Sequence, residues 1–588
     1  MSHAIQIIGA RGGQNDTTGA RPFRQDLEAF VTTGPSFDLY IMALNEMQAT
    51  NQSDPLSYFQ IAGIHGYPQT PWDGVNGSAS NLPGYCEHGS TTFPTWHRPY
   101  LALFEQVLWE KAQSIALLYS EDVRPLYVEV AWWLRIPYWD WASHPALPDV
   151  VQTSSIAINT PSGRAWVDNP LYDYNFHWNS DGNVFLNKGI IFDDFPSTVR
   201  HYNNETQQSD QSAASAQMQA NAGTYMSKVF QLFTDSSDYS TFSCVTPGGV
   251  NNAANNIEII HGNVHNMVGG YGHMFYPEVA AFDPIFWLHH ANVDRLLAMW
   301  QVLNPDNYIE PAVNVWGTYY ESPGTVESGA SSLAPFHSDN GTSMWTSDTV
   351  RDLSVFNYAY PEIPYWGMNA TELANYVRLQ INMKYNPAVA SAHRKVRRRP
   401  LHDGNLHVAF RSMSHAELRS LRVNNADFQW TIRIVMDRYA YVTGFSLDFF
   451  LGPPPDDVSM RATACNLVGT QASFITSNVS AMFPSGPPEG SAQGELSLTH
   501  VLAGGMSRGY LADLSPDSVV PVLQRALTWR ARLPNGEELD VAAIKGLSIS
   551  VGSKATTPAT SEYCFPSYAP TQWHSEATRG KIGGSGCS

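Results

Sequence analysis

The sequence predicts a mainly helical domain over residues 1–385, followed by a β-sandwich over residues 403–588. Three observations support this division. Apolar residues recur at helical spacing in the N-terminal segments. Beyond the basic segment at 391–400, from Trp430 on, the period changes to two, which is the spacing of half-buried strands. Between the two patterns, residues 386–402 contain the basic, polar run 391–400, which ends in a proline and is typical of an exposed linker and candidate cleavage region.

Composition limits the classes of protein that the chain can belong to. With 588 residues it is long enough for two or three domains. Asp and Glu number 53 against 34 Lys and Arg, and this net charge of −19 argues against a nucleic-acid partner. The basic cluster at 391–400 is better explained as a solvated linker than as a nucleic-acid or targeting patch.

The chain carries no sign of a membrane or secretory segment. No run of 18 apolar residues occurs, and the N-terminus lacks the apolar core of a signal peptide. Five cysteines are too sparse for a disulfide framework and suit a reducing compartment. We therefore expect a cytoplasmic, intracellular protein.

The first histidines lie around three predicted N-terminal elements. Residues 37–47 and 55–64 have helical periodicity, with Asp54 as the expected N-cap of the second helix and His65 at its end. Residues 72–92 are rich in Gly, Pro, Asn and Ser and are predicted to form a loop, which holds Cys86 and His88. A long amphipathic helix then starts near Thr95, which places His97 at its beginning.

A second group of histidines lies in residues 257–300. His261 and His265 are four residues apart and therefore share one helix face. Asp283 is the expected N-cap of the next helix, with a proline at the first helical position. On that helix a single face presents three residues at four-residue intervals, namely Phe286, His290 and Asp294. The stretch predicts one half of a metal site.

Strand periodicity dominates the C-terminal region. Trp430, Ile432, Ile434 and Met436 alternate with other residues, and a second alternating run covers 445–451. A helix is expected over residues 517–532. Short strands separated by Pro/Gly turns are typical of a β-sandwich.

The six histidines form two groups of three that are able to bind metal ions. They are His65, His88 and His97 in the first group, and His261, His265 and His290 in the second. Imidazole ligands without carboxylates favour copper or zinc. Zinc-peptidase chemistry requires a glutamate after the first histidine of HExxH, and Gly262 occupies that position. The remaining histidines are expected to be hydrogen-bonded core residues.

Four segments together resemble the two copper-binding regions of the tyrosinases, a family of type 3 copper oxidases: Cys86-x-His88, FPTWHRPYLALFEQVL, HGNVH and DPIFWLHHANVDR. NPLY at 169–172, YAYPE at 358–362 and the long C-terminal extension are most similar to the fungal branch. The resemblance implies a catalytic domain built on a four-helix bundle that holds a dinuclear copper site, with O2 as co-substrate. It also implies a latent form closed by the C-terminal domain.

The resemblance implies a role for each candidate residue. His65, His88 and His97 are expected to bind the first copper, and His261, His265 and His290 the second. Helix geometry also favours His290, because the preceding His289 is turned by about 100°. His273 is a weaker candidate for a copper ligand. Cys86 is expected to form a thioether with His88, the alternative being a buried thiol.

Four further residues are expected to support these ligands. Phe286 packs against a ligand ring, and Asp294 anchors the helix or an imidazole N–H. Glu258 resembles the family's glutamate that holds a water and takes the phenol's proton; the alternative is a solvated glutamate at a helix start. Asn266 is a polar neighbour. Gly262 departs from monophenol-hydroxylating relatives, which often place Asn there.

The implied activity is hydroxylation of monophenols to o-diphenols and oxidation of o-diphenols to o-quinones, which feed melanin formation. The alternatives are a catechol or o-aminophenol oxidase without monophenolase activity, and a non-catalytic oxygen carrier. Partners are expected to be small phenols, O2 and an activating protease, and an oligomer is compatible with the sequence. An aromatic residue of the C-terminal domain, such as Tyr563 or Phe565, is expected to fill the substrate pocket; otherwise that domain only adds stability.

Overall fold

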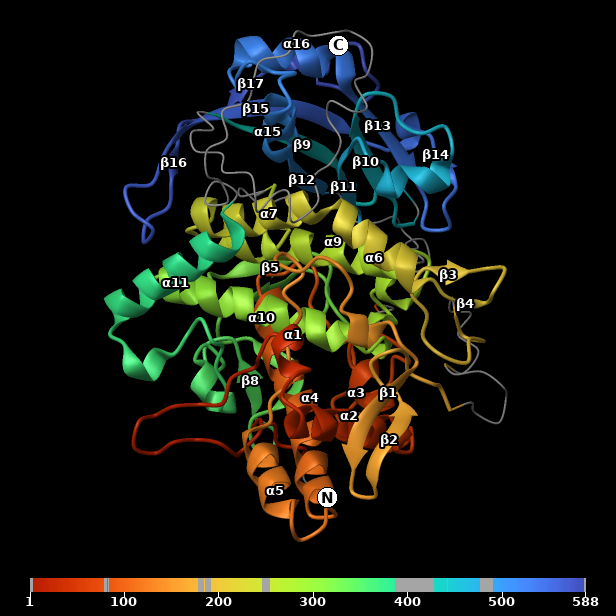
Figure 1. Cartoon of the computed structure of the whole chain (residues 1–588), viewed down its shortest axis with the longest axis vertical. Coiled ribbons are helices and arrows are strands. Elements are labelled where there is room, and N and C mark those ends of the chain that lie inside the picture. The colour runs from red at the N-terminus through yellow and green to blue at the C-terminus, as the bar shows by residue number, and fades with distance from the viewer. Residues whose placement is uncertain are drawn as a thin grey trace. The chain divides into compact units, whose positions relative to one another are not determined.

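The computed structural model describes residues 4–78, 82, 84–177, 185, 192–245, 254–386, 428–441, 443–475 and 490–585. The chain forms two compact units (Figure 1). The first unit comprises Met1–Asp140, Leu147–Gln211 and Gly272–Ala374, and the second Trp141–Ala146, Ser212–Tyr271 and Asn375–Ser588. The predicted linker lies outside the described residues, apart from its first residue. No described helix is long and apolar enough to cross a membrane.

The first unit is mainly helical. Its helices are α1 (Leu27–Phe30), α2 (Pro35–Ala49), α3 (Tyr58–Gly63), α4 (Phe93–Ala116), α5 (Arg124–Trp133) and α10 (Ile285–Leu303). Short 3-10 helices are η1 (Asp149–Val151), η2 (His273–Phe275), η3 (Ala280–Phe282), η4 (Leu353–Phe356) and η5 (Tyr365–Gly367). The strands form two-stranded sheets: β1 (Ser155–Thr160) with β2 (Gly163–Asp168), β3 (Tyr202–Asn203) with β4 (Gln208–Ser209), β5 (Ala312–Asn314) with β6 (Thr325–Glu327), and β7 (Ser332–His337) with β8 (Met344–Thr346). Helix α4 lies at the centre and packs against α2, α5 and α10.

The starts of α3 and α4 differ from the sequence expectation. The Ser57 hydroxyl accepts the Gln60 N–H at 3.2 Å, so Ser57 and not Asp54 is the N-cap of α3. Helix α4 begins at Phe93 because the Thr92 carbonyl already accepts the Trp96 N–H at 2.8 Å. Consequently His97 lies in the second turn of α4, with Pro99 inside the helix.

The second unit contains most of α6 (Gln211–Ala220) and α11 (Ala370–Tyr385), and all of α7 (Ala222–Asp235), α8 (Tyr239–Ser243), α9 (Ile257–Gly269), α15 (Thr499–Ser507) and α16 (Pro516–Ala526). Its strands are β9 (Phe428–Asp437), β10 (Ser446–Leu451), β11 (Leu467–Ala472), β12 (Ser491–Ser497), β13 (Leu527–Arg532), β14 (Glu538–Leu539), β15 (Ser548–Thr557), β16 (Ser567–Tyr568) and β17 (Gln572–Trp573). The 3-10 helices are η6 (Val458–Thr463), η7 (Val541–Ala543) and η8 (Ser575–Ala577).

The described C-terminal strands form two antiparallel sheets. One has the order β11-β10-β13-β14, and the other β12-β9-β15-β16 with β17 paired to β15. The alternating side chains of β9 and β10 meet in one hydrophobic core with α15 and α16, which confirms the β-rich C-terminal region. The predicted helix over 517–532 is divided into α16 and β13, because Leu527–Arg532 pairs along β10.

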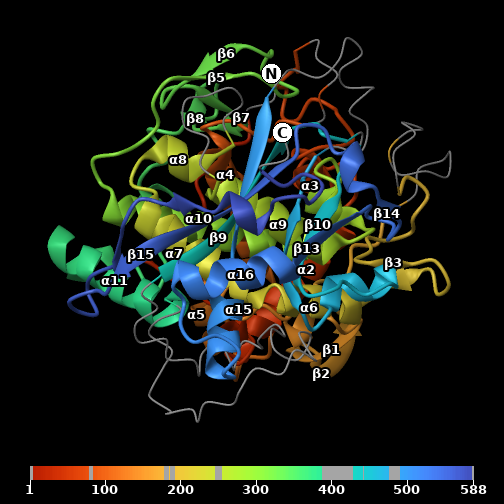
Figure 2. The same ribbon diagram turned by 90° about the horizontal axis from the view of Figure 1, so that it is seen from above.

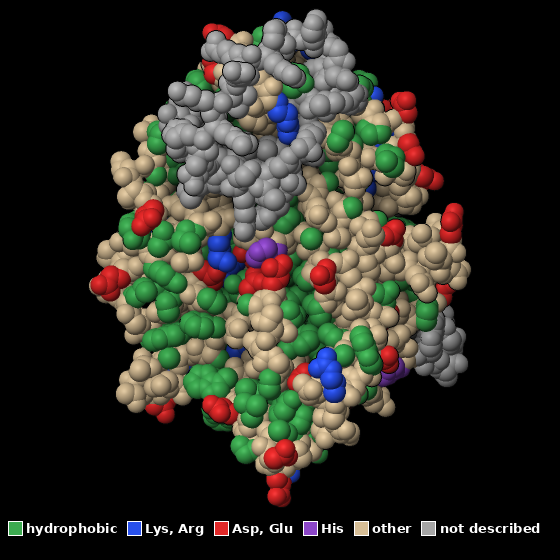
Figure 3. Space-filling view, viewed as in Figure 1, with side chains coloured by type: hydrophobic (Ala, Val, Ile, Leu, Met, Phe, Trp, Pro, Cys, Tyr) green, Lys and Arg blue, Asp and Glu red, His purple; other side chains and the backbone are tan. Residues whose placement is uncertain are grey.

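Helices α7 and α9 lie against strands β11 and β12 within the second unit (Figure 1). Seen from above, α16 crosses the C-terminal strands, with contacts to β10 and β13 (Figure 2). Acidic side chains are scattered over the face drawn in Figure 3 and are not gathered into one patch. Basic side chains are sparse among the residues described on that face, in line with the net charge of −19.

A buried network around Asp294 holds the helices of the first unit together. Its carboxylate accepts hydrogen bonds from Arg98 Nε at 2.7 Å, Tyr358 OH at 2.6 Å and Tyr360 OH at 2.7 Å, and Arg24 Nη1 lies 3.3 Å away. Burial alone would raise the pKa of Asp294, but the two arginines outweigh it and keep this pKa below its ordinary value. The carboxylate therefore remains charged in the core.

Replacing Asp294 by alanine is expected to destabilise the fold by about 3–5 kcal/mol, because it leaves buried guanidinium groups uncompensated. Urea denaturation measures the loss. Since the folded pKa of Asp294 is depressed, its contribution is present above the unfolded pKa of about 3.9 and is lost as pH falls through the folded value.

The matched control is Lys111→Ala, which removes a half-exposed ion pair with Glu46 and should cost no more than about 1 kcal/mol. Equal effects of the two substitutions would contradict the structural role of the Asp294 network.

Candidate metal centre

The first unit brings four of the predicted ligands together. His65 follows α3, His97 lies on α4 and His290 on α10, and each offers a nitrogen within 4.8 Å of the others. These three residues are buried. His88 comes from the loop before α4 and forms a second such group with His65 and Cys86. Segments separated by more than 190 residues in sequence thus supply one cluster of imidazoles.

Two backbone carbonyls orient the imidazoles toward metal binding. His65 Nδ1 donates to the Pro277 carbonyl at 2.8 Å, and His97 Nδ1 donates to the Phe93 carbonyl at 2.8 Å. Each ring therefore keeps its lone pair on Nε2. Within the described part of the chain, His65 Nε2 is buried and has no hydrogen-bond partner. This arrangement fits a metal ion, since ligating histidines commonly donate their other N–H to a carbonyl.

Burial also keeps these rings neutral. It lowers the pKa of His65 to about 4, and burial followed by the neighbouring His65 lowers the pKa of His97 well below its ordinary value. Neutral imidazole is the form that binds copper and zinc. The donor set therefore fits the implied copper ions.

Cys86 lies between two of the histidines. Its Sγ is 3.6 Å from His88 Nε2 and 3.4 Å from His97 Nε2. The next residue, Glu87, points into the protein, where it accepts a hydrogen bond from Asn314 Nδ2 at 3.1 Å. The two residues that precede His88 are therefore held inside the protein, and the sequence alone did not reveal the anchoring role of Glu87.

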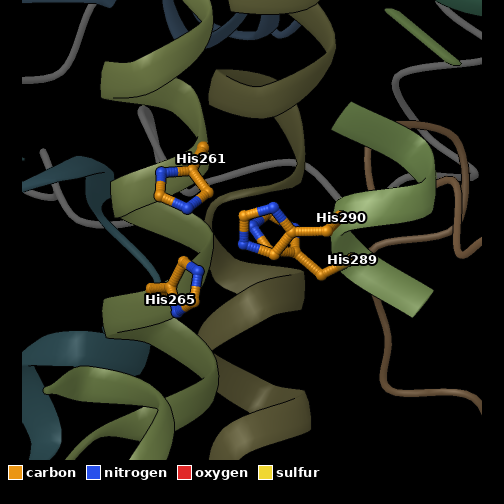
Figure 4. A group of neighbouring side chains, drawn as sticks. All are labelled: His261, His265, His289 and His290. Atoms are coloured by element: carbon orange, nitrogen blue, oxygen red, sulfur yellow. The ribbon is translucent and has the colours of Figure 1, made fainter. Parts of the chain in front are cut away.

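The predicted supporting residues of α10 surround His290. The Phe286 ring lies 4.1 Å from the His290 ring and 5.0 Å from the His65 ring, measured between centroids. The sequence predicts that Asp294 anchors either the helix or an imidazole N–H. The network described above shows that it anchors α10. His289 and His290 leave α10 side by side (Figure 4), and both are buried.

The rival ligand His273 belongs to the aromatic core. Its Nδ1 accepts the Val199 N–H at 3.0 Å, and its ring stacks on Phe192 with a centroid distance of 4.5 Å. Phe176 lies 5.8 Å away. His273 thus has the hydrogen-bonded environment expected of a core histidine.

Helix α9 presents His261 and His265 one turn apart, and their ring centroids lie 4.4 Å from each other (Figure 4). Asn256 starts the helix by accepting the Ile259 N–H at 2.9 Å. Glu258, in the first turn, is buried and accepts the Val245 N–H at 2.9 Å, so it is not a solvated surface residue. The Asn266 carboxamide is buried, and no described residue forms a hydrogen bond with it.

Phe474 of the C-terminal region lies directly on the α9 histidines. Its ring stacks on His265 with a centroid distance of 4.5 Å and an interplanar angle of 26°, and it meets His261 edge-on at 5.5 Å. Sequence reasoning missed Phe474, since it follows the end of β11 and belongs to no motif. The candidates Tyr563 and Phe565 lie elsewhere: Tyr563 is exposed, and Phe565 packs on Phe230 at 5.9 Å.

Buried, neutral imidazoles on helices, with no carboxylate in the ligand groups described here, define a metalloprotein with a nitrogen-donor site. Comparison with known proteins identifies its family. The chain matches the family model "Common central domain of tyrosinase" over residues 55–303 and "Tyrosinase C-terminal domain" over residues 429–551. It is 32% identical to polyphenol oxidase 3 of Agaricus bisporus over 435 residues, which cover 68% of this chain and 73% of that protein. The chain belongs to the tyrosinase family.

Two further relatives support this assignment. A tyrosinase of Podospora anserina is 37% identical over 369 residues, which are 59% of this chain and 63% of that protein. A structure of latent and active mushroom tyrosinase superposes with a TM-score of 0.79 at 26% identity, covering 97% of this chain and 98% of that one. The family and the histidine clusters together imply a type 3 dicopper site, as the sequence predicted.

Replacing either His97 or His261 by alanine is expected to reduce bound copper from about two ions to about one per chain, because each substitution removes one of three ligands from a single ion. Metal analysis after dialysis measures the stoichiometry. The control His177→Ala changes an exposed histidine outside the predicted groups and should retain both ions. Full copper content in both ligand variants would contradict the assignment.

Proposed function

We propose that the chain is a dicopper phenol oxidase that uses O2 to oxidise o-diphenols to o-quinones and to hydroxylate monophenols, for pigment formation. The observation that carries the proposal is the cluster of buried imidazoles on His65, His97 and His290, in which the Nδ1 atoms of His65 and His97 donate to backbone carbonyls and direct Nε2 toward the cluster. We retain the domain limits 1–385, 386–402 and 403–588 as part of this proposal.

The ligands of the first copper would be His65, His88 and His97, and those of the second His261, His265 and His290. When bound, the copper pair supplies O2 binding and accepts electrons from the phenol. The protein fixes the His65 and His97 imidazoles through carbonyl hydrogen bonds and, in this proposal, the His88 imidazole through a thioether from Cys86. Phe286 fills the space between two of the rings and keeps water out.

Glu258 and Asn266 are proposed to handle the phenol's proton. Both lie on α9 at intervals of four residues with Gly262 between them, so they share one helix face. Glu258 is a buried carboxylate that is positioned by the Val245 N–H. The Asn266 carboxamide has hydrogen-bonding capacity that the described protein atoms leave unused, which suits a water or a substrate hydroxyl. A general base can act through one such water.

A second candidate function is a catechol oxidase without monophenolase activity. Gly262 favours it, since this position after His261 holds no polar side chain that could orient a water for a monophenol.

We further propose that the enzyme is latent until the C-terminal region is released by a protease acting in residues 386–402. The stacking of Phe474 on His265 supports this proposal, because an aromatic ring in that place excludes a phenol ring. Similarity to a mushroom tyrosinase with latent and active forms agrees with it.

The proposed activity is tested with copper-loaded protein and oxygen uptake on 4-methylcatechol and on tyramine, before and after limited proteolysis. We expect quinone formation from the catechol, increased by proteolysis. Turnover of tyramine after a lag would favour the first function over the second. Reversible oxygen absorbance without any quinone, in both states of the protein, would instead indicate an oxygen carrier.

Replacing Phe474 by alanine in the uncleaved chain is expected to raise catechol oxidation at least about tenfold, because removing the ring opens the space against His265. Initial rates of quinone formation measure the effect. Phe565→Ala is the matched control, since this C-terminal aromatic residue packs on Phe230 and should leave the protein latent. An unchanged rate for Phe474→Ala would exclude Phe474 as the blocking residue.

A further inference from the structure

We propose that the activated enzyme accepts phenolic side chains carried by an extended polypeptide, bound along α7 and α9 in the position that β11 occupies in the closed form. The inference rests on the proposed function and specifies its substrate class. It is drawn from contacts within the second unit, which contains α7, α9 and β11.

Two asparagine side chains bind the backbone of β11. Asn221 Oδ1 accepts the Thr470 N–H at 2.7 Å, and Asn263 Oδ1 accepts the Ala472 N–H at 2.9 Å. β11 is the edge strand of its sheet and pairs only with β10 among the described strands. N–H groups of alternate residues point to the same edge, so the two asparagines are spaced to hold an extended chain.

The aromatic ring follows at the same two-residue interval. Phe474 is two residues beyond Ala472, and its ring lies on His265. Helices α7 and α9 therefore receive two N–H groups, from Thr470 and Ala472, and one ring, from Phe474. The shorter contacts of both asparagines to β11 are to main-chain N–H groups, and the Gln471 carboxamide lies farther from Asn263 Oδ1, at 3.4 Å. The main-chain contacts are available to any extended peptide with an aromatic residue in third place.

Gly262 allows the Cβ of Phe474 to come close to α9. A β-carbon placed on Gly262 would lie 2.9 Å from the Cβ of Phe474, which is closer than carbon atoms tolerate. Because Gly262 precedes Asn263, one turn of α9 supplies both the space and the hydrogen-bond acceptor. The atom that comes close is the Cβ that joins the ring to the backbone. The space at Gly262 therefore accommodates a ring that is carried by a peptide.

The surface around these contacts is polar and buried in the closed form. Asn221 and Asn263 are each 2% exposed, and Lys228 Nζ donates to Gln471 Oε1 at 3.0 Å. Burial lowers the pKa of Lys228 to about 7. When β11 leaves, all three polar side chains lose their partners in that strand. An incoming peptide would restore the backbone hydrogen bonds to Asn221 and Asn263, whereas a small phenol would not.

The reaction on a peptide is the one already proposed for small phenols. Each peptide-borne catechol loses two electrons and two protons and becomes an o-quinone, and half a molecule of O2 takes them up to form water. No peptide bond is broken, and no co-reactant other than O2 is required.

The test uses copper-loaded full-length protein activated by limited proteolysis, without isolating a fragment. The probe is an acetylated, amidated peptide with the sequence of residues 468–475, VGTQASFI, in which 3,4-dihydroxyphenylalanine replaces Phe474. The reference is N-acetyl-3,4-dihydroxyphenylalanine amide. We expect a KM about tenfold lower for the peptide, since it gains two backbone hydrogen bonds. The diphenol makes the test independent of monophenol hydroxylation.

Backbone esters provide the matched controls. An ester in place of the amide N–H at the Ala472 position should raise the peptide's KM about fivefold. The same change at the Gln471 position, whose N–H faces the opposite edge, should have no effect. In Asn263→Ala the ester at the Ala472 position should cost nothing further, and the preference for the peptide over the reference should shrink.

Equal KM values for peptide and reference, or equal effects of the two esters, would overturn the inference and show that the asparagines serve only to hold the C-terminal region. Either result leaves the proposed function intact if the reference is oxidised. Absence of oxidation of the reference would instead refute the proposed function itself.

Discussion

The buried carboxylate of Asp294 is the interaction on which the first unit depends. Asp294 lies one turn beyond His290 on α10, and its partner Arg98 follows His97 on α4. The ion pair therefore joins two histidine-bearing helices next to their ligands. Arg24 brings in the N-terminal segment, and its guanidinium lies 3.6 Å above the Tyr358 ring. A charge buried this completely is tolerable only because hydrogen bonds surround it.

The same network explains the rigidity that a metal site requires. A metal tolerates little displacement of its ligands, so helices that carry single histidines must be held by contacts outside the ligand set. The Arg295 guanidinium adds a second tie, since it pairs with Glu362 at 2.7 Å and lies over the Tyr138 ring at 4.5 Å. Positions 294 and 295 thus attach α10 to different parts of the first unit.

Helix α9 combines two roles in one turn of helix. His261 and His265 supply imidazoles, while the intervening Asn263 binds β11 and Gly262 makes room for Phe474 beyond the end of that strand. A surface that binds its own C-terminal strand through backbone contacts is also suited to bind a foreign strand. The contacts that keep the enzyme latent would then be the ones that recognise extended peptides. Release of β11 would free these contacts for a peptide substrate.

Much of the site followed from local sequence. Histidines at four-residue spacing, the Asp-Pro start of α10 and alternation in β9 and β10 all concern neighbours along the chain. Errors arose where local signals competed. Helix α4 starts before Thr95, and residues 527–532 form a strand because pairing with β10 overrides their helical periodicity. Glu258 is buried and accepts the N–H of Val245, which lies in a segment that carries no motif.

The sequence by itself determined which residues are candidate copper ligands, because ligand type and helical spacing are local properties. Only the tertiary structure decided that Phe474 lies on His265 and that Asn221 and Asn263 hold β11. Those hydrogen bonds join residues 249 and 209 positions apart. No periodicity along the chain encodes such a pairing, since it arises from the packing of α7 and α9 against a sheet edge that forms elsewhere in the sequence.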